Sequence, residues 1–198
     1  MLDKLRNRLG ASLLSLGRVA ADVGLSPTAW TFVGLWVSIL AAVAFWSSGY
    51  RGMLLGGLLI LLSGFFDIVD GAVAKATGKV SKRGAFLDST LDRVSEVAVY
   101  VGILLGALAS PLAVLLALSF SLLVSYTRAR GDALGASLAG VGIGERSERL
   151  IVLAVSSVVG YTQYGVLVVA VIAAFTFLQR TYTASRSLTP PPPAPPVA

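Results

Sequence analysis

Long apolar stretches recur along this chain of 198 residues, and aspartates interrupt two of them. The stretches LLILLSGFF and VAVYVGILLGAL flank a segment that carries Asp67, Asp70, Asp88 and Asp92. One aspartate at the centre of a membrane helix costs about 2.5–3.5 kcal/mol on insertion scales. Four of them in apolar helices therefore predict a cation that balances their charge.

The spacing of the aspartates suits helices. Asp67 and Asp70 are three residues apart, and Asp88 and Asp92 are four apart, so each pair shares one helix face. The chain has no histidine and no cysteine. Oxygen ligands alone favour a hard divalent cation, Mg²⁺ first. Two other readings are a solvated face of a soluble helix, which the apolar flanks disfavour, and the ion pathway of a transporter.

The composition predicts an all-α integral membrane protein. With 56% hydrophobic residues, the chain has room for about six transmembrane helices of roughly 20 residues each. These are expected at about 26–47, 52–76, 84–107, 110–130, 145–159 and 164–179. The net charge of +6 fits cytoplasmic loops and anionic lipid head groups, and nothing in the sequence supports a nucleic-acid partner.

Three regions are predicted along the chain. Residues 1–25 carry leucines at helical spacing between basic residues, which is typical of an interfacial amphipathic helix. Residues 26–180 form the six-helix domain. Residues 181–198 end in a proline-rich tail that is expected to be disordered.

Loop charges predict the orientation. Basic residues precede the first membrane helix, follow the last, and occupy the second and fourth connections, whereas Arg51 is the one charge in the opposite loops. Both termini are therefore expected in the cytoplasm, in a multi-pass protein of the plasma membrane. All four aspartates then lie at one level near the cytoplasmic interface. A lipid enzyme that takes a soluble head group needs carboxylates at this depth, whereas a transporter needs them deeper.

The aspartates belong to a longer pattern. Asp67-x2-Asp70-Gly71-x2-Ala74-Lys75-x8-Gly84-x3-Asp88-x3-Asp92 resembles the signature of the CDP-alcohol phosphatidyltransferases, D-x2-D-G-x2-A-R-x8-G-x3-D-x3-D. Seven of its eight fixed positions match at the correct spacing, and Lys75 replaces the arginine. Lysine keeps the charge but loses the planar fork. The stretch Pro27 to Thr31 also resembles the P-N-x-x-T that precedes the first helix in this family, with Thr28 in place of Asn.

The resemblance implies transfer of a phosphatidyl or archaetidyl group from a CDP-lipid to an alcohol, with release of CMP by a homodimer. It implies two Mg²⁺ ions, with Mn²⁺ possible, held by Asp67, Asp70, Asp88 and Asp92, and Asp92 as the base for the acceptor hydroxyl. It assigns CDP-lipid binding to Thr31, Asp70, Gly71, Ala74, Lys75 and Gly84. Packing between helices is the alternative role of the small residues.

Two further segments concern the acceptor. Ser125 to Arg130 and Gly144 to Arg149 resemble segments of the inositol-phosphate-using branch, which read S-Y-x-K-A-R and G-x-x-E-R-x-x-R. That branch makes phosphatidylinositol phosphate or archaetidylinositol phosphate. The acceptor is then inositol 1-phosphate, with Arg128, Arg130, Arg146 and Arg149 around its phosphate. Positive charges at helix ends are the alternative. Other open alternatives are a different acceptor, such as glycerol 3-phosphate, and a cation transporter, and the sequence leaves CDP-diacylglycerol and CDP-archaeol equally open as donors.

Overall fold

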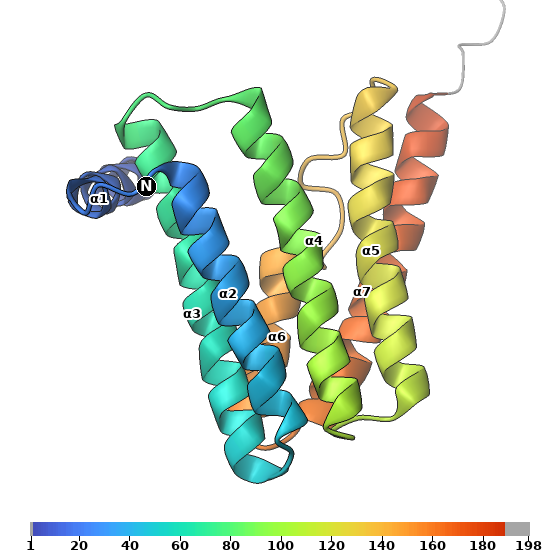
Figure 1. Cartoon of the computed structure of the whole chain (residues 1–198). Helices are drawn as coiled ribbons and strands as arrows, with labels where there is room; N and C mark the ends of the chain where they lie inside the picture. The colour runs from blue at the N-terminus through green and yellow to red at the C-terminus, as the bar shows by residue number, and fades with distance from the viewer. Residues whose placement is uncertain (1, 189–198) are drawn as a thin grey trace, which may run out of the picture.

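Seven α-helices make up the described part of the chain, which covers residues 2–188 in the computed structural model, with side chains from residue 12 onward. They are α1 (Leu2–Asp22), α2 (Pro27–Trp46), α3 (Gly49–Ala76), α4 (Lys82–Leu105), α5 (Pro111–Ala133), α6 (Arg146–Val158) and α7 (Thr162–Ser187). Figure 1 shows α2 to α7 as a bundle, with α1 lying across its end. The all-α prediction is confirmed.

Local sequence explains where several helices begin. The side chain of Ser26 accepts a hydrogen bond from the backbone N–H of Ala29, and Pro27 occupies the first helical position of α2. Ser81 accepts in the same way from Gly84 at the start of α4. These hydroxyl caps satisfy N–H groups that have no partner within the helix, so the two helices that flank α3 start at defined residues.

Four of the described helices are long and apolar enough to cross a membrane, namely α2, α3, α5 and α7. Helix α4 is long enough, but it contains Lys82, Arg83, Asp88, Asp92, Arg93 and Glu96. Helix α6 has only 13 residues, which is about 20 Å of helix against a hydrocarbon core of about 30 Å. The structure thus supports four spans by length and composition, two fewer than the sequence predicts.

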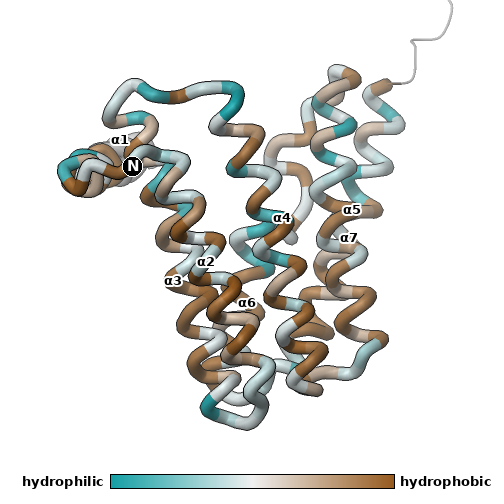
Figure 2. The backbone as a smooth tube through the Cα atoms, viewed as in Figure 1, coloured by the Kyte–Doolittle hydropathy of each residue, from teal (hydrophilic) through white to brown (hydrophobic). Residues whose placement is uncertain are grey.

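The largest hydrophobic core joins the helices at the end of the bundle remote from the aspartates. It includes Phe45, Tyr100, Ile103 and Leu153, all almost fully buried. Close helix contacts support it, since a Cβ at Gly102 would lie 2.3 Å from the carbonyl oxygen of Ala42. Figure 2 shows hydrophobic positions gathered toward this end and most hydrophilic positions toward the other.

Helix α1 packs on α3. Ala20 of α1 is buried in a small cluster with Val69 and Val73 of α3. At Gly17, a Cβ would lie 2.3 Å from the carbonyl oxygen of Ala72, so only glycine permits this approach. The helical prediction for the N-terminal region holds, whereas the basic and leucine side chains of residues 2–11 lie outside the described ones.

Helix α7 runs further than the sequence suggested. It ends at Ser187 rather than near residue 179, so the first seven residues of the predicted tail are helical. No proline or glycine occurs between Arg180 and Ser187, and nothing there stops the helix. The proline-rich part, residues 189–198, lies outside the described residues.

Candidate functional site

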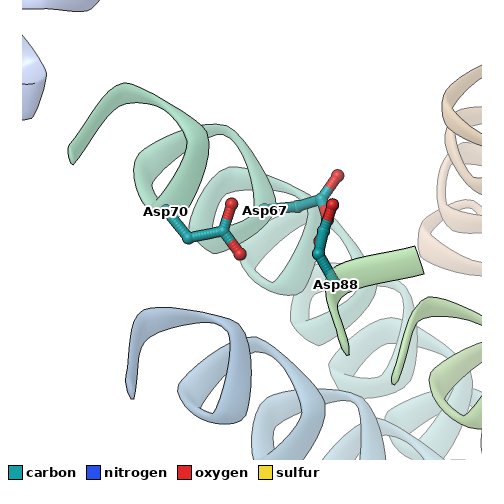
Figure 3. A group of neighbouring side chains, drawn as sticks. All are labelled: Asp67, Asp70 and Asp88. Carbon is teal, nitrogen blue, oxygen red and sulfur yellow. The ribbon is translucent and has the colours of Figure 1, made fainter. Parts of the chain in front are cut away.

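Three of the four aspartates meet at one place. Asp67 and Asp70 project from one face of α3 and Asp88 projects from α4, and Figure 3 shows their carboxyl groups turned toward one another. One carboxylate oxygen from each lies within 4.8 Å of the others. Asp70 is buried and the other two are half-buried. The spacing of three along α3 creates this convergence, because it places both carboxylates on the side that faces α4.

This cluster fits a divalent cation. Asp70 Oδ2 and Asp88 Oδ1 are buried and have no hydrogen-bond partner among the described residues. Buried carboxylate oxygens without a partner are costly. A hard cation such as Mg²⁺, Mn²⁺ or Ca²⁺ takes carboxylate oxygens as ligands and offsets that cost. The residues present therefore suit the metal that the sequence predicts.

Asp92 has a different partner. It lies one turn beyond Asp88 on α4, and Arg146 Nη1 approaches its Oδ1 at 2.8 Å and Asp67 Oδ2 at 3.2 Å. Arg146 is the first residue of α6, so the start of that helix delivers a guanidinium to the aspartates. The sequence pattern assigns Arg146 to the acceptor phosphate. In the structure its guanidinium bridges Asp67 of α3 and Asp92 of α4.

A cavity of about 370 Å³ opens beside Asp70 and Asp88, between the start of α2, the end of α3 and the start of α4. Its lining includes every residue predicted for CDP-lipid binding, namely Thr31, Asp70, Gly71, Ala74, Lys75 and Gly84. At Gly71 a Cβ would meet nothing within 4 Å. The absence of a side chain at Gly71 therefore leaves open space and does not serve helix packing.

A groove of about 410 Å³ lies between α1 and α3. Leu13 and Leu14 of α1 line it together with Asp67, Gly71 and Lys75 of α3. Lys75 thus borders both the cavity and the groove. An apolar wall from α1 and a charged wall from α3 suit a molecule with both apolar and anionic parts.

The four predicted acceptor arginines do not converge. Arg149 is 2% exposed and forms a forked contact with Glu96, at 2.9 Å from Nη2 to Oε1 and 3.2 Å from Nη2 to Oε2. Its Nη1 donates to the carbonyl oxygen of Gly144. Arg130 is exposed in the last turn of α5. Glu96 occupies Nε and Nη2 of Arg149 and Gly144 occupies Nη1, so each guanidinium nitrogen of Arg149 already has a partner.

Arg180 is a charged residue near Arg128 that sequence reasoning missed. Arg128 Nη1 lies 3.4 Å from Glu145 Oε1, and Arg180 Nη2 lies 3.5 Å from the same oxygen. Arg180 of α7 is 2% exposed and donates to the carbonyl oxygens of Val141 and Val124. The available signal was a charge within an apolar helix. Because the sequence predicts that the last helix ends near residue 179, Arg180 falls just outside that helix and the signal is lost.

Comparisons with known proteins point to the family that the aspartate pattern resembles. The model of the family described as CDP-alcohol phosphatidyltransferase matches residues 24–178. An archaetidylinositol phosphate synthase from Pyrococcus horikoshii is 38% identical over 188 residues, which is 95% of this chain and 98% of that protein.

Two crystal structures of the phosphatidylinositol phosphate synthase from Mycobacterium tuberculosis share the fold. The form with CDP-DAG bound has a TM-score of 0.73 at 28% identity, covering 87% of this chain and 92% of the other. The form in complex with manganese and citrate has a TM-score of 0.77 at 30% identity, covering 87% and 88%.

Proposed function

We propose the following reaction for this chain, which belongs to the CDP-alcohol phosphatidyltransferase family: transfer of a phosphatidyl or archaetidyl group from a CDP-lipid to inositol 1-phosphate, with release of CMP. The observation that carries the proposal is the carboxylate cluster of Asp67, Asp70 and Asp88 at the rim of a cavity lined by all the predicted donor residues. The named synthases among the relatives support the inositol phosphate acceptor.

Asp67, Asp70 and Asp88 would hold a divalent metal, which we take to be Mg²⁺, with Mn²⁺ as a substitute. Asp92 would complete the ligands for a second ion. Such metals neutralise a diphosphate and polarise the attacked phosphorus when bound. The manganese in a structural neighbour supports a divalent ion and leaves its identity open.

The chain's own residues would divide the remaining work. Lys75 holds the anionic diphosphate at the mouth of the cavity, and Gly71 leaves room for it to approach α3. Asp92 accepts the proton of the acceptor hydroxyl. Arg146, at 2.8 Å from Asp92 and 3.2 Å from Asp67, holds these two carboxylates close to each other.

The acceptor phosphate would lie at Arg128 and Arg180. The exposed Arg130 would attract the anion electrostatically from solution. Arg180 takes the place that the sequence had given to Arg149, whose guanidinium Glu96 already occupies. Two arginines from different helices suit a phosphate through several charge-assisted hydrogen bonds. The donor could carry diacylglycerol or archaeol, because both end in the bilayer.

We further propose six membrane spans, with α4 and α6 crossing inside the bundle, and α1 lying in the cytoplasmic interface. Helix α4 packs between α2 and α5, and α6 contacts α3 and α7. Glu96 of α4 pairs with Arg149 of α6 inside the bundle. Figure 2 supports the orientation, since the hydrophilic positions gather at the end where α1 lies. The family domain then spans 26–180 between α1 and the tail, in a plasma-membrane homodimer with cytoplasmic termini.

CMP release tests the reaction. Purified protein with Mg²⁺ and a CDP-lipid should release CMP when inositol 1-phosphate is added, and much less with glycerol 3-phosphate or unphosphorylated inositol. The phosphate-binding residues explain the lower rate with unphosphorylated inositol, because each charge-assisted contact is worth about 1.5–3 kcal/mol. Glycerol 3-phosphate also carries a phosphate, so its lower rate would reflect the missing inositol ring. If only glycerol 3-phosphate supported CMP release, then glycerol 3-phosphate, and not inositol 1-phosphate, would be the acceptor. No CMP with any acceptor would contradict the enzyme and favour cation transport through the same carboxylates.

Gly71 offers a separate test of the donor cavity. Gly71→Leu should raise the KM for CDP-lipid about ten- to hundredfold, because the side chain fills space that the head group needs. Its thermal stability should stay near wild type, since a Cβ there meets nothing within 4 Å.

Gly102→Ala is the matched control. A Cβ at Gly102 meets the Ala42 backbone at 2.3 Å, so this variant should lose about 1–3 kcal/mol of stability and keep the donor KM. Unchanged CDP-lipid kinetics in a folded Gly71→Leu protein would place the nucleotide elsewhere.

A further inference from the structure

Glu145 lies where two arginines meet. It immediately precedes α6, and its Oε1 lies 3.4 Å from Arg128 Nη1 of α5 and 3.5 Å from Arg180 Nη2 of α7. The Arg180 side chain is 3% exposed, and its Nη2 has no hydrogen-bond partner among the described residues. A buried guanidinium nitrogen without a hydrogen bond is costly. It points to an anion that would bind here better than the carboxylate does.

The carboxylate of Glu145 is held loosely. It is 40% exposed, and a single oxygen serves both arginines at distances too long for strong charge-assisted bonds. The Glu96–Arg149 pair shows the contrast, because both side chains are 1% exposed and both carboxylate oxygens bind, at 2.9 and 3.2 Å. Glu145 can therefore leave its arginines for solvent, whereas Glu96 cannot.

The start of α6 does not depend on that contact. The backbone N–H of Glu145 donates to Glu148 Oε2 at 2.8 Å, which caps the helix from the other direction. The next residue, Arg146, is anchored to Asp67 and Asp92. The Glu145 side chain also accepts from the backbone N–H of Glu148 in this capping box. It gives up that one bond when it swings away, while the contacts of Glu148 and Arg146 keep the backbone beside the aspartates in place.

We propose that Glu145 is a built-in competitor for the acceptor phosphate, occupying the space between Arg128 and Arg180 until a phosphate displaces it. The inference rests on the proposed function, in which the acceptor carries a phosphate. A phosphomonoester brings a charge of about −1.5 to −2 and three acceptor oxygens, against one charge and one bound oxygen from Glu145. An unphosphorylated polyol brings no charge and leaves Glu145 in place. Glu145 therefore makes the site selective for phosphorylated acceptors.

Calorimetry with inorganic phosphate tests the competition without any reaction. Purified protein in detergent, with neither CDP-lipid nor divalent metal, is titrated with phosphate. Glu145→Gln keeps the shape but removes the competing charge, and it should bind phosphate about ten- to hundredfold more tightly than wild type. Glu145→Asp, which keeps the charge but reaches less far, should bind with intermediate affinity and serves where the Gln variant folds poorly.

Glu148→Gln is the matched control, since it makes the same change three residues later on the exposed face of α6. Its phosphate affinity should equal that of wild type. Adding Arg128→Gln to Glu145→Gln should abolish most of the gain, and Arg128 is exposed enough for this change to spare folding.

The opposite role of Glu145 would be to orient the two arginines for the phosphate. In that case the folded Gln and Asp variants would bind phosphate as wild type does or more weakly, and the proposal would be wrong. Tighter phosphate binding without CMP release from any CDP-lipid would uphold the competitor and reject the proposed reaction. CMP release with unchanged phosphate affinity would do the reverse. In active enzyme, Glu145→Gln should lower the KM for inositol 1-phosphate and leave the KM for CDP-lipid unchanged.

Discussion

Replacing Asp70 or Asp88 by Asn is expected to lower the rate of CMP release by at least about a hundredfold. Both carboxylates belong to the cluster with Asp67, and each contributes a buried oxygen without a hydrogen bond. A bound divalent ion supplies several kcal/mol of transition-state stabilisation, and Asn removes a ligand charge without changing shape. The affinity for Mn²⁺, measured by electron paramagnetic resonance, should fall together with the rate.

The other two aspartates extend this prediction. Asp67→Asn should behave as the first pair does, whereas Asp92→Asn should reduce kcat more than CDP-lipid binding if Asp92 is the base. Asp22→Asn is the control, because Asp22 is exposed at the end of α1. Retention of more than about a tenth of the wild-type rate by all four variants would contradict a shared metal site.

Arg149→Ala is expected to lower the free energy of unfolding by about 3–5 kcal/mol, because it leaves the buried carboxylate of Glu96 without a partner. Thermal unfolding in detergent, followed by circular dichroism, measures the loss. Exchanging both residues for apolar ones, Glu96→Leu with Arg149→Met, should recover most of the stability, because no buried charge then remains.

Arg128→Ala is the matched control for this pair. Arg128 is about 43% exposed, and its contact with Glu145 lies partly in solvent. Its removal should cost less than about 1 kcal/mol. If Arg149→Ala unfolded at the wild-type temperature, the ion pair with Glu96 would not stabilise the fold. Arg149 would then again be a candidate for binding the acceptor phosphate.

Local sequence patterns sufficed to group Asp67, Asp70 and Asp88 and the residues that line the adjacent cavity. The three-residue spacing of Asp67 and Asp70 fixes a shared helix face, and a short connection brings the next helix back beside it. The residues that line the cavity lie within the same two helices and the start of α2. Sequence alone could therefore group these residues, because they lie on helices that are consecutive in the chain and joined by short connections.

The arginines could not be placed in this way. Arg149 pairs with Glu96, 53 residues earlier, and Arg180 bonds to a carbonyl 56 residues earlier on α5. Such partners depend on how α4, α5, α6 and α7 pack, which spacing along one helix does not encode. Arginines near helix ends fit the positive-inside rule equally well, so their charge alone did not distinguish a fork held by Glu96 from one open to a ligand.

The two ends of the bundle differ in how freely they can change over evolution. Figure 1 shows α2 and α3 diverging from α5 and α7 toward the end that carries the aspartates. At the opposite end, Gly102 and Gly106 press against backbone atoms and Phe45 is fully buried. On the proposed function, mutations at the diverging end would alter which alcohol is accepted, while the packed end keeps the protein folded. A lineage would then acquire new lipid head groups by a few substitutions around Glu145, without rebuilding the scaffold.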